Sequence, residues 1–159
     1  MRYARIKPND IANGVGISVS LFTQGCPHHC KGCFNVETWS FDGGKEFTEE
    51  DKEYLFDCLD KNGIKRNLSI LGGEPLCEQN IDGVIELCKE FKAKYPDRQI
   101  YVWTGYEIEY LMENHEDKTS ELMDNIDWLI DGKFIEEEKD LSLKLRGSRN
   151  QRIIGIIRD

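Results

Sequence analysis

Three of the six cysteines lie within eight positions, in the stretch QGCPHHCKGCFN at residues 24–35. Cys26, Cys30 and Cys33 follow the spacing C-x3-C-x2-C. Closely spaced cysteines in a chain without a secretion signal indicate metal binding or catalysis more than disulfide formation. Zinc and iron–sulfur clusters are the two kinds of metal centre that such thiolates hold.

Of these two centres, the spacing favours a [4Fe-4S] cluster. A structural zinc site takes four ligands, usually as two separated pairs, and no second pair follows here. A cube normally takes four thiolates, so three leave one iron free to bind a substrate or cofactor. Zinc stays an alternative in which His28 or His29 is the fourth ligand, but we expect both histidines to be loop residues.

The other three cysteines lie outside this stretch. Cys58 and Cys88 occupy apolar positions of segments with helical spacing, so we expect them to be buried core residues. Cys77 follows the GGEP stretch by two positions and could belong to the core or to a site. We favour the core for Cys77.

Short apolar segments predict four strands that alternate with segments of helical periodicity. The predicted strands are residues 16–22, 67–71, 100–103 and 128–130, with a further strand or edge segment at 153–157. Thr48 is the expected N-cap of the first helix, which ends at Asn62-Gly63. The predicted apolar stripe of this first helix is Tyr54, Leu55, Cys58 and Leu59. The second predicted helix buries Ile81, Val84, Ile85, Cys88 and Phe91. A third predicted helix covers residues 106–114.

This alternation predicts right-handed βαβ units and a parallel sheet, in which functional residues gather at the carboxyl ends of the strands. The stretches QGCPHHCKGCFN, GGEP, WTGY and DGKF each follow a predicted strand, so we expect them to converge on one edge. A full eight-stranded barrel needs about 250 residues, whereas this chain has 159. We therefore predict an α/β fold: a single domain over residues 1–159 that forms an incomplete, open parallel β/α barrel.

Charge and hydropathy narrow the class of protein. The net charge of −9 opposes binding to phosphate backbones, so no nucleic-acid partner is expected. The sequence has no apolar run of membrane-spanning length and no signal peptide at its N-terminus, which predicts a soluble, cytoplasmic protein without a membrane partner. Residues 144–152 gather Lys144, Arg146, Arg149 and Arg152, which could be a solubilising patch, an anion site or a docking surface.

Two motifs together carry a resemblance to a known family. A C-x3-C-x2-C loop directly after a first strand, followed by GGEP at the end of a second, resembles the radical S-adenosylmethionine superfamily. Within it the chain is similar to the activating proteins of anaerobic ribonucleoside-triphosphate reductase. The matching stretches are NGVGISVSLF at 13–22, QGCPHHCKGCFN at 24–35, TW at 38–39, GGEPL at 72–76, WTGY at 103–106, DGKF at 131–134 and RGSRNQRI at 146–153.

The resemblance implies a [4Fe-4S] cluster that cleaves S-adenosylmethionine reductively, so that a 5'-deoxyadenosyl radical forms a glycyl radical on the reductase. Its implied partners are the large subunit of the anaerobic reductase and a low-potential electron donor such as flavodoxin or ferredoxin. The implied catalytic residues and metal ligands are Cys26, Cys30 and Cys33. The implied cofactor-binding residues are Gly32, Cys33, Phe34, Gly72, Gly73 and Glu74.

One position departs from the superfamily pattern: Gly32 stands where many members carry an aromatic residue, and Phe34 follows the last cysteine. Thr104, Tyr106, Asp131 and Lys133 are further candidates to line the cofactor pocket or a partner groove. Two other functions stay open: an enzyme of the superfamily that acts on another glycyl-radical enzyme or a small molecule, and a non-catalytic zinc or iron–sulfur module.

Overall fold

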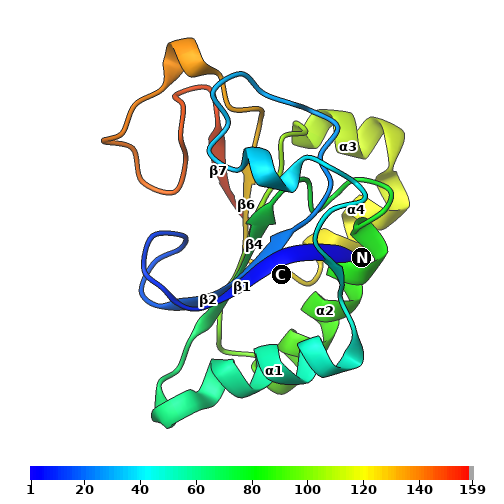
Figure 1. The fold of residues 1–159 in the computed structure, drawn as a ribbon, viewed down its shortest axis with the longest axis vertical. Coiled ribbons are helices and arrows are strands. Elements are labelled where there is room, and N and C mark those ends of the chain that lie inside the picture. Colours follow the sequence, from blue (N-terminus) through cyan, green and yellow to red (C-terminus); the bar gives the residue numbers. More distant parts are fainter. Residues whose placement is uncertain (158–159) are drawn as a thin grey trace.

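The structure is a computed structural model that describes residues 1–157. Its centre is one seven-stranded sheet with the order β3-β1-β2-β4-β5-β6-β7 (Figure 1). The strands are β1 (Arg2–Asp10), β2 (Ser18–Thr23), β3 (Lys45–Glu46), β4 (Asn67–Gly72), β5 (Ile100–Trp103), β6 (Trp128–Asp131) and β7 (Arg152–Gly155). The α-helices are α1 (Glu49–Asp60), α2 (Ile81–Lys94), α3 (Ile108–Asn114) and α4 (Glu116–Met123), and short 3-10 turns are η1 (Val36–Thr38), η2 (Lys61–Gly63) and η3 (Glu136–Glu138).

The middle of the sheet is parallel, as predicted. β2, β4, β5 and β6 are neighbours in chain order and pair in parallel. Antiparallel strands flank them, with β1 against β2 and β7 against β6. The fold is therefore a mixed α/β fold in which a parallel sheet carries antiparallel edges.

The helices lie on one side of this sheet (Figure 1). Residues 11–17 and 139–151 loop out on the opposite side. Right-handed crossovers between strands that are neighbours in chain order place every helix on the same face. The other face of the sheet is left to loops.

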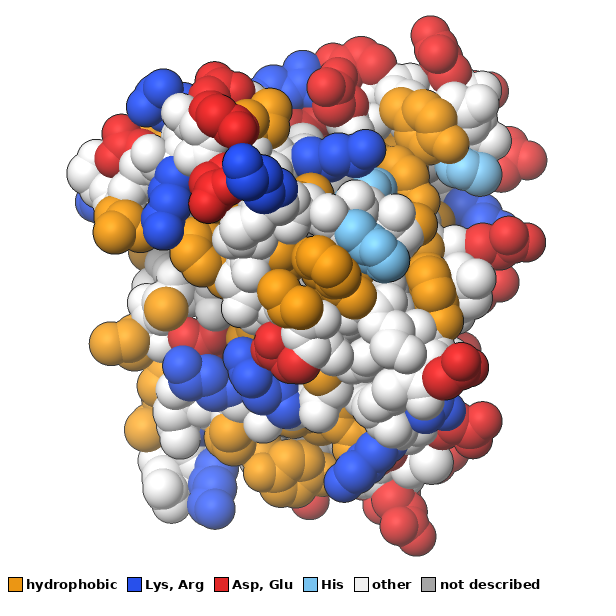
Figure 2. Space-filling model, turned by 45° about the horizontal axis from the view of Figure 1, so that its top comes forward, with side chains coloured by type: hydrophobic (Ala, Val, Ile, Leu, Met, Phe, Trp, Pro, Cys, Tyr) orange, Lys and Arg blue, Asp and Glu red, His pale blue; other side chains and the backbone are white. Residues whose placement is uncertain are grey.

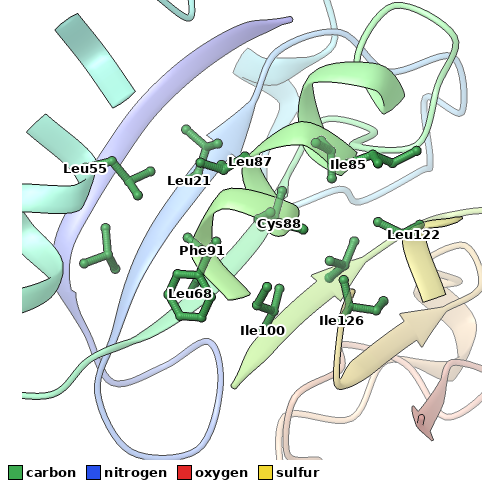
Figure 3. Close-up of a cluster of buried hydrophobic side chains, with 14 of the residues drawn as sticks. Leu21, Leu55, Leu68, Ile85, Leu87, Cys88, Phe91, Ile100, Leu122 and Ile126 are labelled. Carbon is green, nitrogen blue, oxygen red and sulfur yellow. The ribbon is translucent and has the colours of Figure 1, made fainter. Parts of the chain in front are cut away.

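The core lies between the sheet and the helices (Figure 3). Leu21 and Leu68 of the strands pack with Leu55 of α1 and Phe91 of α2 in this core, and all four are fully buried. Cys58 and Cys88 belong to the same cluster, which confirms their prediction as core residues.

The prediction that Tyr54 belongs to the buried stripe of α1 is wrong, because Tyr54 is 51% exposed. The N-terminus of α1 is as predicted, because the Thr48 side chain and Asp51 form a reciprocal capping box. At the other end Asn62 has a left-handed backbone, with φ of 59°. The stop signal at Asn62-Gly63 is therefore confirmed.

Candidate functional site

The loop at residues 24–35 is tied to neighbouring turns by backbone hydrogen bonds. The amides of Gly25 and Cys26 donate to the carbonyls of Thr38 and Trp39 at 2.7 and 3.1 Å. The carbonyl of Gly25 accepts from the amide of Glu74 at 2.8 Å. The cysteine loop and the GGEP turn are therefore held side by side at the carboxyl ends of β2 and β4.

A cavity of about 600 Å³ opens at these strand ends. All three clustered cysteines line it, together with residues from GGEP, WTGY, DGKF and the segment 139–151. The predicted convergence of the strand-end motifs is confirmed. Of the sequence-predicted site residues, the cavity is lined by Cys26, Cys30, Cys33, Phe34, Gly72, Gly73, Thr104 and Lys133.

Four predicted residues do not line this cavity: Gly32, Glu74, Tyr106 and Asp131. Asp131 is fully buried and holds neighbouring elements, accepting from the amide of Ile108 at 2.9 Å and from the guanidinium of Arg152. Tyr106 stacks on Tyr110. Both residues are therefore structural in this fold.

Backbone N–H groups surround the three thiols. The amides of His28 and His29 act to lower the pKa of Cys26, and the amide of Phe134 acts to lower that of Cys30. The amide of Asn35 donates to the Cys33 sulfur at 3.3 Å. Such donors around the sulfur ligands are the environment in which iron–sulfur clusters are held and tuned.

Burial acts against ionisation of these thiols. It raises the pKa of Cys26 to about 11, although hydrogen bonds from the His28 and His29 amides oppose the shift. Burial also raises the pKa of Cys30. Coordination to a metal centre removes the proton from a thiol and would overcome this effect of burial.

No three acidic, histidine or cysteine side chains among residues 1–157 come together as ligands of a single metal ion. A cube does not require such a grouping, because each cysteine binds a different iron atom. The donor set of three thiols with surrounding amides therefore fits a [4Fe-4S] cluster.

The carboxylate of Glu74 is fully buried and ties together three turns. Its Oε1 accepts from the Gly105 amide at 2.7 Å and lies 2.7 Å from His28 Nε2. Its Oε2 accepts from Thr104 Oγ1 at 2.8 Å and from the Leu76 amide at 2.9 Å. Glu74 thus braces the turns behind the cavity.

Both histidines of the cysteine loop are loop residues, as predicted. His29 has a left-handed backbone, with φ of 48°, and its ring stacks on that of Trp39 with centroids 4.5 Å apart. His28 binds Glu74 as described above. Sequence reasoning missed this pair, since 46 positions separate the two residues and no local pattern links them.

The structure explains the glycine at position 32. Gly32 has φ of +76°, and a Cβ at this position would lie 3.0 Å from the Glu136 side chain. Phe34 and Phe134 form an aromatic surface in the cavity, with ring centroids 5.0 Å apart. Lys139 lies over the Phe34 ring, and Gly147 would contact both rings if it carried a Cβ.

The four basic residues of the stretch 144–152 have different surroundings in the structure. Arg152 is paired with Asp131 and with Glu109, which lowers the pKa of Glu109 to about 2. Arg146 lines the cavity and donates to the Gln151 carbonyl at 2.6 Å, while its buried Nε has no hydrogen-bond partner among the described residues. Lys144 and Arg149 are exposed.

Cys77 is 3% exposed and does not line the cavity. The side-chain amide of Asn80 donates to its sulfur at 3.4 Å. Cys77 is therefore buried, as predicted, although it is not a member of the main core cluster.

The charged residues that line the cavity are mostly cationic. Among the described lining residues Arg5, Lys7, Lys133 and Arg146 face a single acid, Asp140. This balance contrasts with the net charge of −9 for the whole chain. On the face of the molecule shown in Figure 2, Lys and Arg side chains surround exposed apolar side chains and a histidine.

Fold and site together define an α/β protein with three closely spaced cysteines at the cavity. The chain matches the 4Fe-4S single cluster domain family over residues 12–154. A protein of Vibrio cholerae is 41% identical over 152 residues, which cover 95% of this chain and 96% of that protein. A protein of Escherichia coli K12 is 39% identical over the same share of each chain. One from phage T4 is 40% identical over 96% of this chain and 93% of its own.

All three relatives are named anaerobic ribonucleoside-triphosphate reductase-activating protein. At this identity and coverage, the chain belongs to the family of anaerobic ribonucleoside-triphosphate reductase-activating proteins. The described residues include no helix long and apolar enough to cross a membrane.

Proposed function

We propose that this protein activates anaerobic ribonucleoside-triphosphate reductase by reductive cleavage of S-adenosylmethionine at a [4Fe-4S] cluster. The observation that carries the proposal is that all three clustered cysteines and Gly72-Gly73 line one cavity. The relatives' shared name, at about 40% identity, supports the reductase as target. We further propose that residues 1–159 form one radical S-adenosylmethionine domain, an incomplete β/α barrel, and that the protein works in the cytoplasm.

In this proposal Cys26, Cys30 and Cys33 bind three irons of the cluster. The amides of His28, His29 and Phe134 lower the pKa of the Cys26 and Cys30 thiols and would so favour the thiolates that bind iron. These three thiolates would leave one iron of a cube without a protein ligand. A bound cluster would supply the electron for reductive cleavage of S-adenosylmethionine to methionine and a 5'-deoxyadenosyl radical, which would take a hydrogen from a reductase glycine.

The GGEP turn would hold the amino-acid part of S-adenosylmethionine. Gly72 and Gly73 line the cavity, and a Cβ on either would meet backbone of β2 or of the cysteine loop at 2.7 or 2.5 Å. Their lack of side chains therefore lets the GGEP turn and the cysteine loop lie in contact. We place the base near the backbone of Gly32 and Cys33 and the ring of Phe34, and Glu74 acts through the turn that it braces.

The reductase would approach the face of the sheet that no helix covers. Ile11, Val15 and Leu141 are 81%, 67% and 81% exposed and lie on the two segments that loop out on that side (Figure 1). A seated reductase segment would exclude water from the cavity, which protects a reactive carbon radical. A low-potential donor such as flavodoxin or ferredoxin would supply the electron.

An anaerobic assay tests the chemistry. The protein is reconstituted with iron and sulfide, then mixed with a strong reductant and S-adenosylmethionine. We expect 5'-deoxyadenosine and methionine in equal amounts. A colourless, zinc-loaded protein that leaves S-adenosylmethionine intact would contradict an enzymatic function.

The alternative within the superfamily, another glycyl-radical enzyme or a small molecule as substrate, is separated by the partner. Adding anaerobic reductase should produce a glycyl-radical doublet in the electron paramagnetic resonance spectrum. Cleavage of the cofactor without this doublet would show that the assigned partner is wrong.

A further inference from the structure

The side chain of His28 is enclosed although its loop lies at the surface. It is 7% exposed, and its Nε2 lies 2.7 Å from Glu74 Oε1. The Tyr106 ring meets it edge-on with centroids 4.6 Å apart. On another side lies Gly105, where a Cβ would come within 2.5 Å of the imidazole. The fold therefore gives this ring one position.

The hydrogen of this contact is assigned from the other partners of Glu74. Both of its carboxyl oxygens already accept from backbone amides, so we assign the hydrogen shared with His28 to Nε2. The other three donors to Glu74 come from Leu76, Thr104 and Gly105. His28 is the donor among them that belongs to the cysteine loop.

The three turns held by this carboxylate each border the cavity. His28 comes from the loop between Cys26 and Cys30, Glu74 from the GGEP turn after β4, and Gly105 from the turn after β5. The cysteine loop also hydrogen-bonds the GGEP turn through backbone. Between the cysteine loop and the turn after β5, the His28–Glu74–Gly105 bridge makes a hydrogen-bonded link beside the contact of the His28 and Tyr106 rings.

We propose that His28 is a positioning residue: its Nε2–H bond to Glu74 fixes the cysteine loop relative to the GGEP turn and Gly105. This inference rests on the proposed function, because the groups so aligned are the cluster ligands and the turn assigned to the amino-acid part of S-adenosylmethionine. His28 acts through Glu74 and needs no contact with the metal. Losing this bond leaves part of a buried carboxylate unpaired, which loosens both turns.

The variants separate the hydrogen bond from the presence of a ring. His28→Ala removes the donor, whereas His28→Gln places an amide N–H at about the same reach from the backbone. Thr104→Val removes a different donor to the same carboxylate. His115→Ala is the matched control, since this exposed histidine lies between α3 and α4 and does not line the cavity.

Three readouts are measured on reconstituted protein: bound iron, the dissociation constant for S-adenosylmethionine, and hydrogen exchange of the Gly105 amide. We expect His28→Ala to keep its iron, to bind S-adenosylmethionine about tenfold more weakly and to exchange the Gly105 amide about tenfold faster. Thr104→Val should weaken binding in the same direction. His28→Gln should recover most of the loss, and His115→Ala should match the wild type.

Three results would overturn the proposal. The first is a His28→Ala protein whose cofactor affinity and Gly105 exchange match those of His115→Ala. The second is a His28→Gln protein as impaired as His28→Ala, and the third is loss of iron from both variants, since each of these two outcomes gives the ring a role other than this hydrogen bond. If wild-type protein fails to cleave S-adenosylmethionine, the proposed function fails, while Gly105 exchange still decides whether His28 holds the turns together.

Discussion

At the scale of single residues, the site depends on side chains that are absent as much as on those present. Gly32 adopts a left-handed backbone and leaves room for Glu136 over the cysteine loop. Lys31 beside it pairs with Glu136 and Glu137 at 3.6 and 3.9 Å. The segment around η3 therefore lies directly on the second half of the loop.

Gly32→Ala tests this packing. A left-handed backbone disfavours a Cβ by about 1–2 kcal/mol, and the Glu136 side chain adds a steric contact. We expect the free energy of unfolding of the iron-free protein, measured with urea, to fall by more than this backbone cost, because the steric contact with Glu136 adds to it. Adding Glu136→Ala should recover only the steric part; full recovery would mean that the backbone conformation carries no cost.

The cysteines divide into two groups with opposite expected behaviour. Cys26→Ala, Cys30→Ala or Cys33→Ala should abolish the cluster, as measured by iron and sulfide content after reconstitution. Cys58→Ala is the matched control, because Cys58 is buried in the core, and it should keep the cluster while losing about 1 kcal/mol of stability. A cluster-free Cys58 variant would refute its assignment to the core.

At the scale of elements, local patterns predicted the parallel strands but not the edges. β2 and β4 are continuous buried runs, which short apolar segments reveal. β1, with the sequence RYARIKPND, is charged and only partly buried, so its strand state comes from pairing with β2. α4 was also missed, since its sequence EDKTSELM buries only Thr119 and Leu122.

The connection between β1 and β2 is held by Asp10, whose carboxylate is buried. Burial alone would raise the pKa of Asp10, but hydrogen bonds from Ser20, Asn13 and the Ala12 amide, with Lys7 nearby, lower it overall. A lowered folded-state pKa stabilises the fold above the unfolded value of about 4, and this contribution disappears as the pH falls through the folded-state pKa.

Asp10→Asn should therefore be less stable than wild type at pH 6, and the difference should shrink towards pH 3. Urea unfolding of both proteins at several pH values measures it. Comparing the two proteins cancels the titration of all other carboxylates. A stability difference that stays constant from pH 6 to pH 3 would contradict the lowered pKa.

At the scale of the whole molecule, the sequence predicted which motifs meet but not how they are held. Each motif follows an apolar strand, so their convergence followed from the parallel arrangement of those strands. The bridge from His28 to Glu74, and the contact of Glu136 with the loop at Gly32, join residues far apart in sequence. Such contacts depend on side-chain packing that no local pattern encodes.

Docking of the reductase would involve the whole face of the sheet that no helix covers. Ile11→Asp and Val15→Asp place charges on exposed apolar side chains of the looped-out segment 11–17, and neither residue lines the cavity. We expect reductase activation to fall about tenfold or more, while cleavage of S-adenosylmethionine by the isolated protein stays unchanged. Ile64→Asp, an exposed apolar position after η2, is the control. Equal activation by Ile11→Asp, Val15→Asp and wild type would remove this segment from the docking surface.

The most direct test of the account follows one hydrogen atom. Reductase labelled with deuterium at its glycine α-carbons is mixed anaerobically with the reconstituted protein, reductant and S-adenosylmethionine, and the 5'-deoxyadenosine is analysed by mass spectrometry. The account predicts one deuterium in the 5'-deoxyadenosine for each glycyl radical formed. Unlabelled 5'-deoxyadenosine alongside a full glycyl-radical signal would contradict it.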